Sequence, residues 1–240
     1  MKFALQLIDW QARAPGLSEA SQWQQWSRQP YAIDPTAAQA KLTELPMMAA
    51  RRLNSGSKLA VECGLTMLRT HAIDAVLYTS RHGELERNFR ILQALATQQA
   101  VSPTDFTMSV HNSAVGNLTI TAQKPLVSSS LSAGIDTFQQ GLCEVVCLLQ
   151  AGYKRVLMVD FDGALPAFYH PRLPPDMPTW AWAVAMVFET GDALECRSQP
   201  TDIAREMPLP QSLQFLQRLL SGAPSFTLPG DHMQWHWSRK

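Results

Sequence analysis

The side chains best suited to chemistry gather in the middle of the chain, around a run of hydroxyl residues. These are Ser128, Ser129, Ser130 and Ser132. His111 lies upstream and is a residue type that serves as a general base. A serine acyltransferase or hydrolase that uses Ser130 or Ser132 with His111 is one interpretation. A nucleophile elbow has the form Gly-x-Ser-x-Gly, however, and neither serine has both glycines. We therefore favour packing and hydrogen bonding as the role of these serines.

Two aspartates follow an apolar run further along, in Val159-Asp160-Phe161-Asp162-Gly163. The segment is similar to the first motif of haloacid-dehalogenase-type phosphatases, in which the first aspartate attacks phosphorus. That chemistry also needs a downstream lysine and further aspartates that hold magnesium. The only lysine after Asp162 is Lys240, and no aspartate pair follows. We therefore favour a buried strand that ends in polar residues at a turn, and rank a phosphatase last among the functions considered.

The residue types that bind metals do not occur at ligand spacing. The cysteines are Cys63, Cys143, Cys147 and Cys196. They form no Cys-x-x-Cys pair, so we expect buried, reduced thiols. His232 and His236 are four residues apart beside Trp235 and Trp237, without a third ligand nearby. We interpret that segment as an aromatic tail that packs on this chain or on a partner, and predict neither a metal nor another cofactor.

Composition excludes several classes of partner. The chain has 240 residues, of which 46% are hydrophobic, and its 20 basic residues balance 20 acidic ones. This balance gives no electrostatic case for binding nucleic acid or an anionic membrane. No stretch approaches about 18 apolar residues without a charge, so no membrane span is predicted. Gln6 and Asp9 interrupt the short apolar run at the start, and we expect a cytoplasmic protein with one domain over residues 1–240.

Strands and amphipathic helices alternate along the chain. Strands are predicted at 3–9, 75–79, 126–130, 156–161, 180–188 and 193–197, with the last two paired to each other. Helices are predicted at 17–28, 47–69 with breaks at 54–57 and 64, 84–99, 106–122, from 133 onward and 211–220, with a possible short helix from 35. Five prolines make 163–179 a loop. The pattern predicts an α/β fold with a mixed central sheet covered by helices on both faces.

The serine run belongs to a predicted strand, turn and helix. Leu126-Val127-Ser128 favours a strand, and from Ala133 onward the apolar residues recur at helical spacing. A nucleophile at such a junction would have its anion stabilised by the helix dipole. Leu131 lies at this junction, and its side chain has neither a lone pair nor an acidic proton.

Three segments together resemble the N-terminal half of β-ketoacyl synthases of the thiolase fold. They are residues 75–85, the run Ser102-Pro103 to Ile120 that contains Ser109-Val110-His111-Asn112, and residues 126–136. The resemblance covers roughly residues 45–165 and implies a truncated thiolase-like fold. Aligning Ala133-Gly134-Ile135-Asp136 with the small-Gly-Leu-Asp pattern of the family places Leu131 on the catalytic cysteine.

Two departures from the family imply a subunit that cannot condense acyl chains. Leu131 replaces the cysteine that would carry the acyl chain as a thioester. Neither of the family's two histidine motifs, one like His-Gly-Thr-Gly and one before a Gly-Phe-Gly-Gly-like turn, occurs after residue 165.

Relatives without the cysteine are chain length factors, and the Ser-Val-His-Asn form is similar to those of bacterial aryl polyene clusters. The resemblance implies a heterodimer or heterotetramer with a catalytic β-ketoacyl synthase that serves an acyl carrier protein. Thiolase-type subunits pair through central strands, here residues 126–130, while residues 106–115 would pack on the partner. The implied partner interface and acyl tunnel comprise Phe106, Met108, His111, Asn112, Val115, Leu126, Val127, Ser128, Ser129, Ser130 and Leu131.

Overall fold

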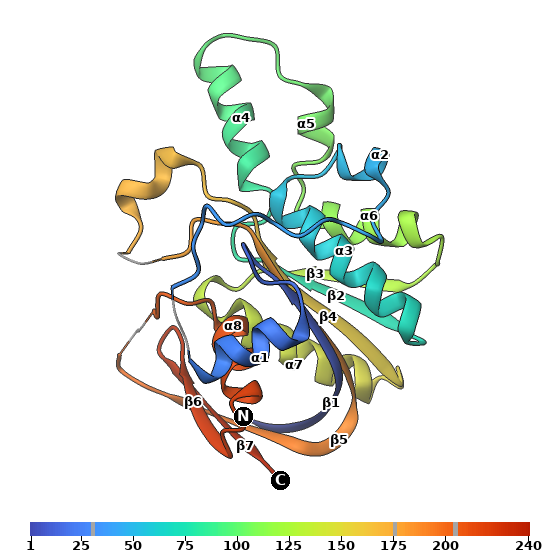
Figure 1. The fold of residues 1–240 in the computed structure, drawn as a ribbon, viewed down its shortest axis with the longest axis vertical. Coiled ribbons are helices and arrows are strands. Elements are labelled where there is room, and N and C mark those ends of the chain that lie inside the picture. The colour runs from blue at the N-terminus through green and yellow to red at the C-terminus, as the bar shows by residue number, and fades with distance from the viewer. Residues whose placement is uncertain (30–31, 175–176, 204–205) are drawn as a thin grey trace.

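A computed structural model describes residues 1–240 apart from 30–31, 175–176 and 204–205. Its centre is a mixed, seven-stranded sheet (Figure 1). The strands are β1 (Lys2–Arg13), β2 (Ala75–Thr79), β3 (Val127–Leu131), β4 (Arg155–Asp162), β5 (Trp182–Pro200), β6 (Ser225–Pro229) and β7 (Met233–Arg239). Their order is β3-β2-β4-β5-β7-β6, with β1 paired to β5. The pairs β2–β3 and β2–β4 are parallel and the remaining pairs are antiparallel.

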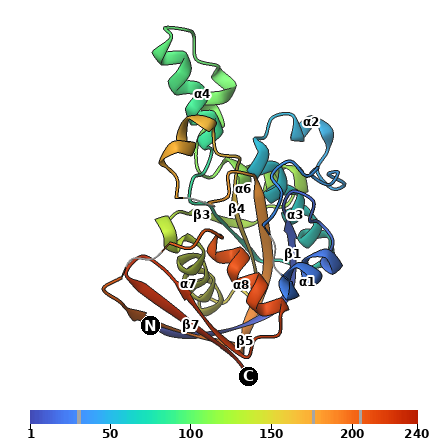
Figure 2. The ribbon, with the colours of Figure 1, turned by 60° about the vertical axis from the view of Figure 1, so that its left-hand side comes forward.

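Helices cover both faces of the sheet, as predicted (Figures 1 and 2). They are α1 (Ala20–Arg28), α2 (Met47–Ala50), α3 (Ser55–Thr70), α4 (Leu85–Ala96), α5 (Pro103–Thr107), α6 (Ser113–Ala122), α7 (Thr137–Gln150) and α8 (Gln211–Leu220). Two 3₁₀ turns, η1 (Gly134–Asp136) and η2 (Ala167–Arg172), complete the set. The described helices include none long and apolar enough to cross a membrane.

The two faces of the sheet bury separate hydrophobic clusters. On one face, apolar residues of α3 and α6 such as Leu59 and Leu118 pack on Val76 of β2. On the other face, α1, α7 and α8 contribute residues that include Phe138 and Phe215. Every residue of β2 is buried, because a parallel strand between two helical layers meets apolar side chains on both sides.

The helices α4 and α5 form an arm that projects from the body of the molecule (Figures 1 and 2). Ion pairs fix its base: the Asp105 carboxylate lies 2.7 Å from the Arg87 guanidinium and 2.8 Å from that of Arg90. Asn54, at the start of α3, donates to the Glu84 carboxylate at 2.8 Å. The charged side chains Arg87, Arg90 and Asp105 of the arm therefore form ion pairs with one another at its base.

One predicted helix is wrong, because residues 106–122 form parts of two. Helix α5 begins earlier, where Pro103 follows the N-cap Ser102, and it ends at Thr107. The Ser109 hydroxyl then donates to the Phe106 carbonyl at 2.8 Å. A side chain that competes for backbone acceptors favours a turn over a helix, and α6 starts afresh at Ser113.

The predicted pairing of 180–188 with 193–197 is also wrong, because residues 182–188 and 193–197 belong to the single strand β5. The residues between the two ranges do not close a hairpin, because β1 extends to Arg13 and pairs with both halves of β5. Shifts in register at Leu5/Gln6 and Leu7/Asp9 take up the irregularity. Pairing with a distant strand overrides the local turn preference.

Smaller expectations also differ from the structure. A turn rather than a helix follows Pro35, α3 continues through Gly64, and the break between α2 and α3 ends at Asn54. The proline-rich loop contains η2. Cys63 and Cys196 are buried and Cys143 is half-buried, but Cys147 is exposed because it lies on the solvent side of α7.

The C-terminal aromatic residues pack on this chain. Residues 225–239 form the β6–β7 hairpin, in which Trp235 and Trp237 are buried. The Asp136 carboxylate accepts hydrogen bonds from Trp235 Nε1 at 3.0 Å and from Gln211 Nε2 at 2.9 Å. The Asp231 backbone N–H also donates to it at 3.1 Å, so a buried carboxylate with three donors ties the hairpin to η1 and α8.

Candidate functional site

Strand β3 forms one end of the sheet and pairs only with β2 among the described residues. Its first three residues, Val127, Ser128 and Ser129, are exposed. An edge strand without cover presents unpaired N–H and C=O groups, which form a template for a further strand. The segment predicted to pair with a partner subunit is therefore at a free edge.

A shallow groove runs between β3 and the start of α6, with an empty volume of about 920 Å³. Its walls are His111, Asn112, Val115, Gly116, Ser128, Ser129, Ser130 and Ser132. Six of the residues predicted for the partner interface thus meet in one place, although they come from two separate segments.

The other predicted interface residues lie around this groove rather than in it. Phe106 is on the arm, with 69% of its surface exposed. Met108 and Leu126 are half-buried and pack against the cluster on the α3 and α6 face. Val127 is exposed at the start of β3, and Leu131 ends that strand.

The groove does not pair His111 with a serine. His111 Nε2 lies 3.0 Å from the Ser80 carbonyl oxygen, and the Ser132 hydroxyl donates to the Arg81 carbonyl at 3.3 Å. Ser130 Oγ is buried and has no hydrogen-bond partner among the described residues. In this arrangement a serine nucleophile lacks the base contact that would activate it.

Leu131 is the last residue of β3 and lies opposite Thr79 of β2. Its side chain is half-buried against the cluster that includes α7 and α8. Gly134 then turns the chain with a φ of +60°, a conformation that suits glycine, and α7 begins at Thr137. The predicted order of strand, turn and helix is correct, with the strand at Val127–Leu131 rather than 126–130.

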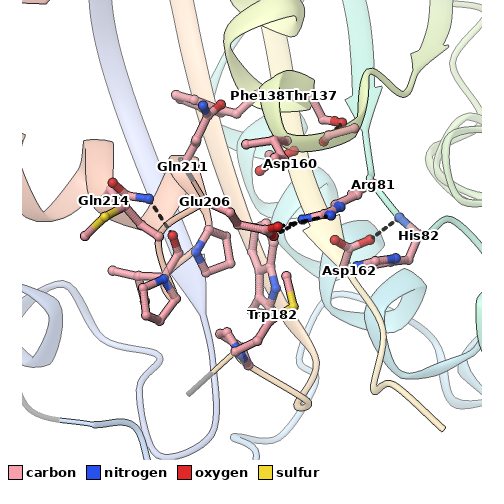
Figure 3. A pocket seen from close by; sticks show the side chains of 18 of the residues that line it. Arg81, His82, Thr137, Phe138, Asp160, Asp162, Trp182, Glu206, Gln211 and Gln214 are labelled. Carbon is pink, nitrogen blue, oxygen red and sulfur yellow. Dashed lines mark hydrogen bonds and ion pairs between the residues drawn. The ribbon is translucent and has the colours of Figure 1, made fainter. Parts of the chain in front are cut away.

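A second, inner pocket lies at the carboxyl ends of β2 and β4, with about 660 Å³ of empty volume (Figure 3). Asp160 and Asp162 line it. Asp160 Oδ1 accepts a hydrogen bond from Thr79 Oγ1 at 2.6 Å. Burial raises the pKa of Asp160 to about 7, against the smaller opposing effects of neighbouring hydroxyls.

Asp162 contacts the loop that follows β2. Its Oδ1 accepts from the Ser80 hydroxyl at 2.6 Å. It also accepts from the His82 backbone N–H at 2.9 Å (Figure 3). Burial raises the pKa of Asp162, and the charges of His82 and Arg81 partly oppose this. Arg81 also forms an ion pair with Glu206 beside the same pocket.

Sequence reasoning treated Asp160 and Asp162 as polar ends of a strand and did not identify their neighbours. Ser80 follows β2 directly, and parallel strands end at the same edge of a sheet, so this proximity was open to prediction. The ion pair between Arg81 and Glu206 joins distant segments of the chain, and no local sequence pattern predicts it. No group of three or more metal-ligating side chains occurs in the described part of the chain.

Comparison with known proteins identifies the family. Residues 23–238 match the family model described as the N-terminal domain of β-ketoacyl synthase. A chain in the solved structure of the ketosynthase ApeO in complex with its chain length factor ApeC, from Xenorhabdus doucetiae, is 57% identical. That match covers 99% of this chain and 100% of the other, with a TM-score of 0.94. No curated protein matches.

Two more distant structures share the fold. The ishigamide ketosynthase/chain length factor is 13% identical with a TM-score of 0.65, over 83% of this chain and 68% of that one. A β-ketoacyl synthase from Burkholderia phymatum is 12% identical with a TM-score of 0.58, over 93% and 71%. The fold is thiolase-like, and the chain belongs to the family of the β-ketoacyl synthase N-terminal domain.

Proposed function

We propose that this chain is a chain length factor, a subunit without condensing activity that pairs with an active β-ketoacyl synthase. The observation that carries the proposal is the free edge of β3, which forms one wall of the groove beside α6. The 57% identical chain comes from a structure that contains a ketosynthase and its chain length factor, which supports the same kind of assembly here.

The segment of residues 91–135, which includes α5, α6 and β3, has the composition of an interface. Residues 91–135 contain only two acidic or basic residues, Asp105 and Lys124, whereas 17% of the whole chain is charged. The exposed large apolar residues within this range are Leu92, Leu95, Phe106, Val110, Ile120 and Val127. The cores of protein interfaces are depleted in charged residues.

In this role, residues 1–240 act as one cytoplasmic domain. Met108, His111 and Asn112 are the residues that we place closest to the acyl tunnel shared with the partner. The tunnel would hold a polyene chain attached to an acyl carrier protein, as in aryl polyene synthesis. Leu131 at the nucleophile position supplies no group to form a thioester, so the partner performs every covalent step.

Co-expression tests the proposal. We expect the chain to form a stable complex with ApeO of Xenorhabdus doucetiae, measured by size-exclusion chromatography with light scattering. Condensation of malonyl thioesters should require ApeO. The proposal fails if the purified chain condenses malonyl thioesters alone, or if it does not bind ApeO.

Mass spectrometry distinguishes a subunit without condensing activity from a serine acyltransferase or hydrolase. After incubation with an acyl thioester, we expect no covalent adduct on Ser130 or Ser132. An adduct that disappears in Ser130→Ala or Ser132→Ala, and in His111→Gln, would support an acyltransferase or hydrolase instead.

A further inference from the structure

The loop of residues 80–83 is held from beneath by a single buried carboxylate. Asp162 Oδ1 accepts from both the Ser80 hydroxyl and the His82 N–H. The Ser80 hydroxyl oxygen in turn accepts from the Gly83 N–H at 2.8 Å. Gly83 has a φ of +56°, so the loop is a tight turn whose shape depends on these hydrogen bonds.

The opposite side of the same loop contacts the groove. The Ser80 carbonyl is the partner of His111 Nε2, and the Arg81 carbonyl accepts from Ser132 Oγ. His111 and Ser132 both line the groove. The ring of His111 also packs directly over Gly83. The loop therefore connects a buried acid with two surface side chains of the proposed interface.

We propose that Asp162 is a positioning residue for the partner interface: its carboxylate fixes residues 80–83, which set His111 and Ser132 for the ketosynthase. Protonation of Asp162 loosens the loop and weakens the complex. The inference rests on the proposed function and adds a residue that does not itself contact the partner.

The direction of the pH effect follows from the hydrogen bonds. An ionised carboxylate accepts two hydrogen bonds at Oδ1, and charge-assisted bonds are the stronger ones. Burial raises the pKa of Asp162, so the ionised form is present at high pH and is lost as the pH falls. The titratable and charged groups around it are Asp160 on β4, His82 and Arg81 in the loop, Glu206 paired with Arg81, and Glu86 of α4 against Gly163.

The test compares Asp162→Asn with Asp160→Asn, using ApeO as the binding probe and titration calorimetry between pH 5.5 and 8. The two aspartates are buried on the same face of β4, but Asp160 bonds Thr79 rather than residues 80–83. We expect Asp162→Asn to weaken binding about tenfold at pH 8, the size of one charged hydrogen bond. Wild type and Asp160→Asn should lose affinity on acidification, whereas Asp162→Asn should lose little.

A second measurement needs no partner. The NMR resonances of the His111 ring in the free chain should shift toward those of a solvent-exposed histidine in Asp162→Asn and Ser80→Ala, but not in Asp160→Asn. Unchanged His111 resonances and unchanged affinity in Asp162→Asn would overturn the inference. Failure of the wild-type chain to bind ApeO would overturn the proposed function, and the NMR result would still decide whether Asp162 positions His111.

Discussion

Strands β1 and β3, each of which pairs with a single strand among the described residues, are built in opposite ways. Strand β1 is twelve residues long, its register shifts twice, and it carries charges that include Lys2, Asp9 and Arg13. Strand β3 has five residues, pairs with β2 in unbroken register and has no charge. Bulges and charges are the usual means by which a free edge avoids pairing with another chain. Their presence on β1 and absence from β3 indicate that, of these two strands, β3 is the one suited to a partner strand.

The buried carboxylates on the two sides of the sheet, Glu62 near β1 and Asp160 and Asp162 towards β3, also differ in their surroundings. At the β1 end, Glu62 is fully buried, pairs with Arg13 at 3.2 Å and accepts the backbone N–H groups of Thr43 and Leu45 at 2.6 and 2.8 Å. At the β3 end, burial leaves Asp160 and Asp162 with raised pKa values. Glu62 therefore has a cationic partner and several N–H donors, whereas burial dominates the surroundings of Asp160 and Asp162.

The largest expected effect comes from placing a charge on the β3 edge. Ser129→Lys should weaken the complex with ApeO about 100-fold, because a lysine buried at an interface core without a counter-charge is costly. Ile8→Lys on β1 is the matched control and should bind as wild type. Calorimetry measures both, and equal losses in the two variants would remove the distinction between the edges.

The arm defines how far the interface extends from β3. We expect Leu92→Lys combined with Leu95→Lys to weaken binding about tenfold, since both side chains are exposed on the uncharged part of α4. Met47→Lys with Met48→Lys is the control, because that exposed pair lies on α2, beside Arg51 and Arg52. If the two double variants weaken ApeO binding equally, the interface does not coincide with the charge-poor residues 91–135.

The buried acids should make stability depend on pH. The pKa of Asp160 is about 7 in the folded chain and near 3.8 when unfolded, so the folded state binds more protons between these values. The free energy of unfolding should therefore fall as the pH rises, by about 1 kcal/mol between pH 6 and 7. Thermal melts measure this fall. Asp160→Asn should reduce it without abolishing it, because Asp162 contributes in the same direction; an unchanged slope would contradict the assignment.

The smallest effect is expected at the β1 edge. Lys2 Nζ lies 3.0 Å from Glu195, but the lysine side chain is exposed, and such pairs add little to stability. Lys2→Ala should leave both Tm and ApeO affinity unchanged. Slow self-association of this variant at high concentration, seen by light scattering, would fit a protective role for charges on this edge.

Local sequence patterns were sufficient to predict the elements in which local preference and tertiary packing favour the same structure. The ranges 75–79 and 211–220 were predicted with the bounds that β2 and α8 have. The apolar runs also gave the α/β class, because strands that are apolar on both faces require two helical layers. The predicted pairing of 180–188 with 193–197 was wrong, because both segments pair with β1 instead. The single helix predicted at 106–122 was also wrong, because the Ser109 side chain stabilises a turn there.

The sequence by itself determined that position 131 carries a leucine, which has no nucleophilic group in any arrangement in space. It also showed that residues 91–135 contain few charged side chains. Only the tertiary structure decided that β3 is an edge strand, that His111 meets residues 80–83 rather than a serine, and that Asp162 lies beneath that loop. These contacts join residues that are 31 and 80 positions apart in the chain. Side-chain type is a local property, whereas such contacts depend on the packing of the whole sheet.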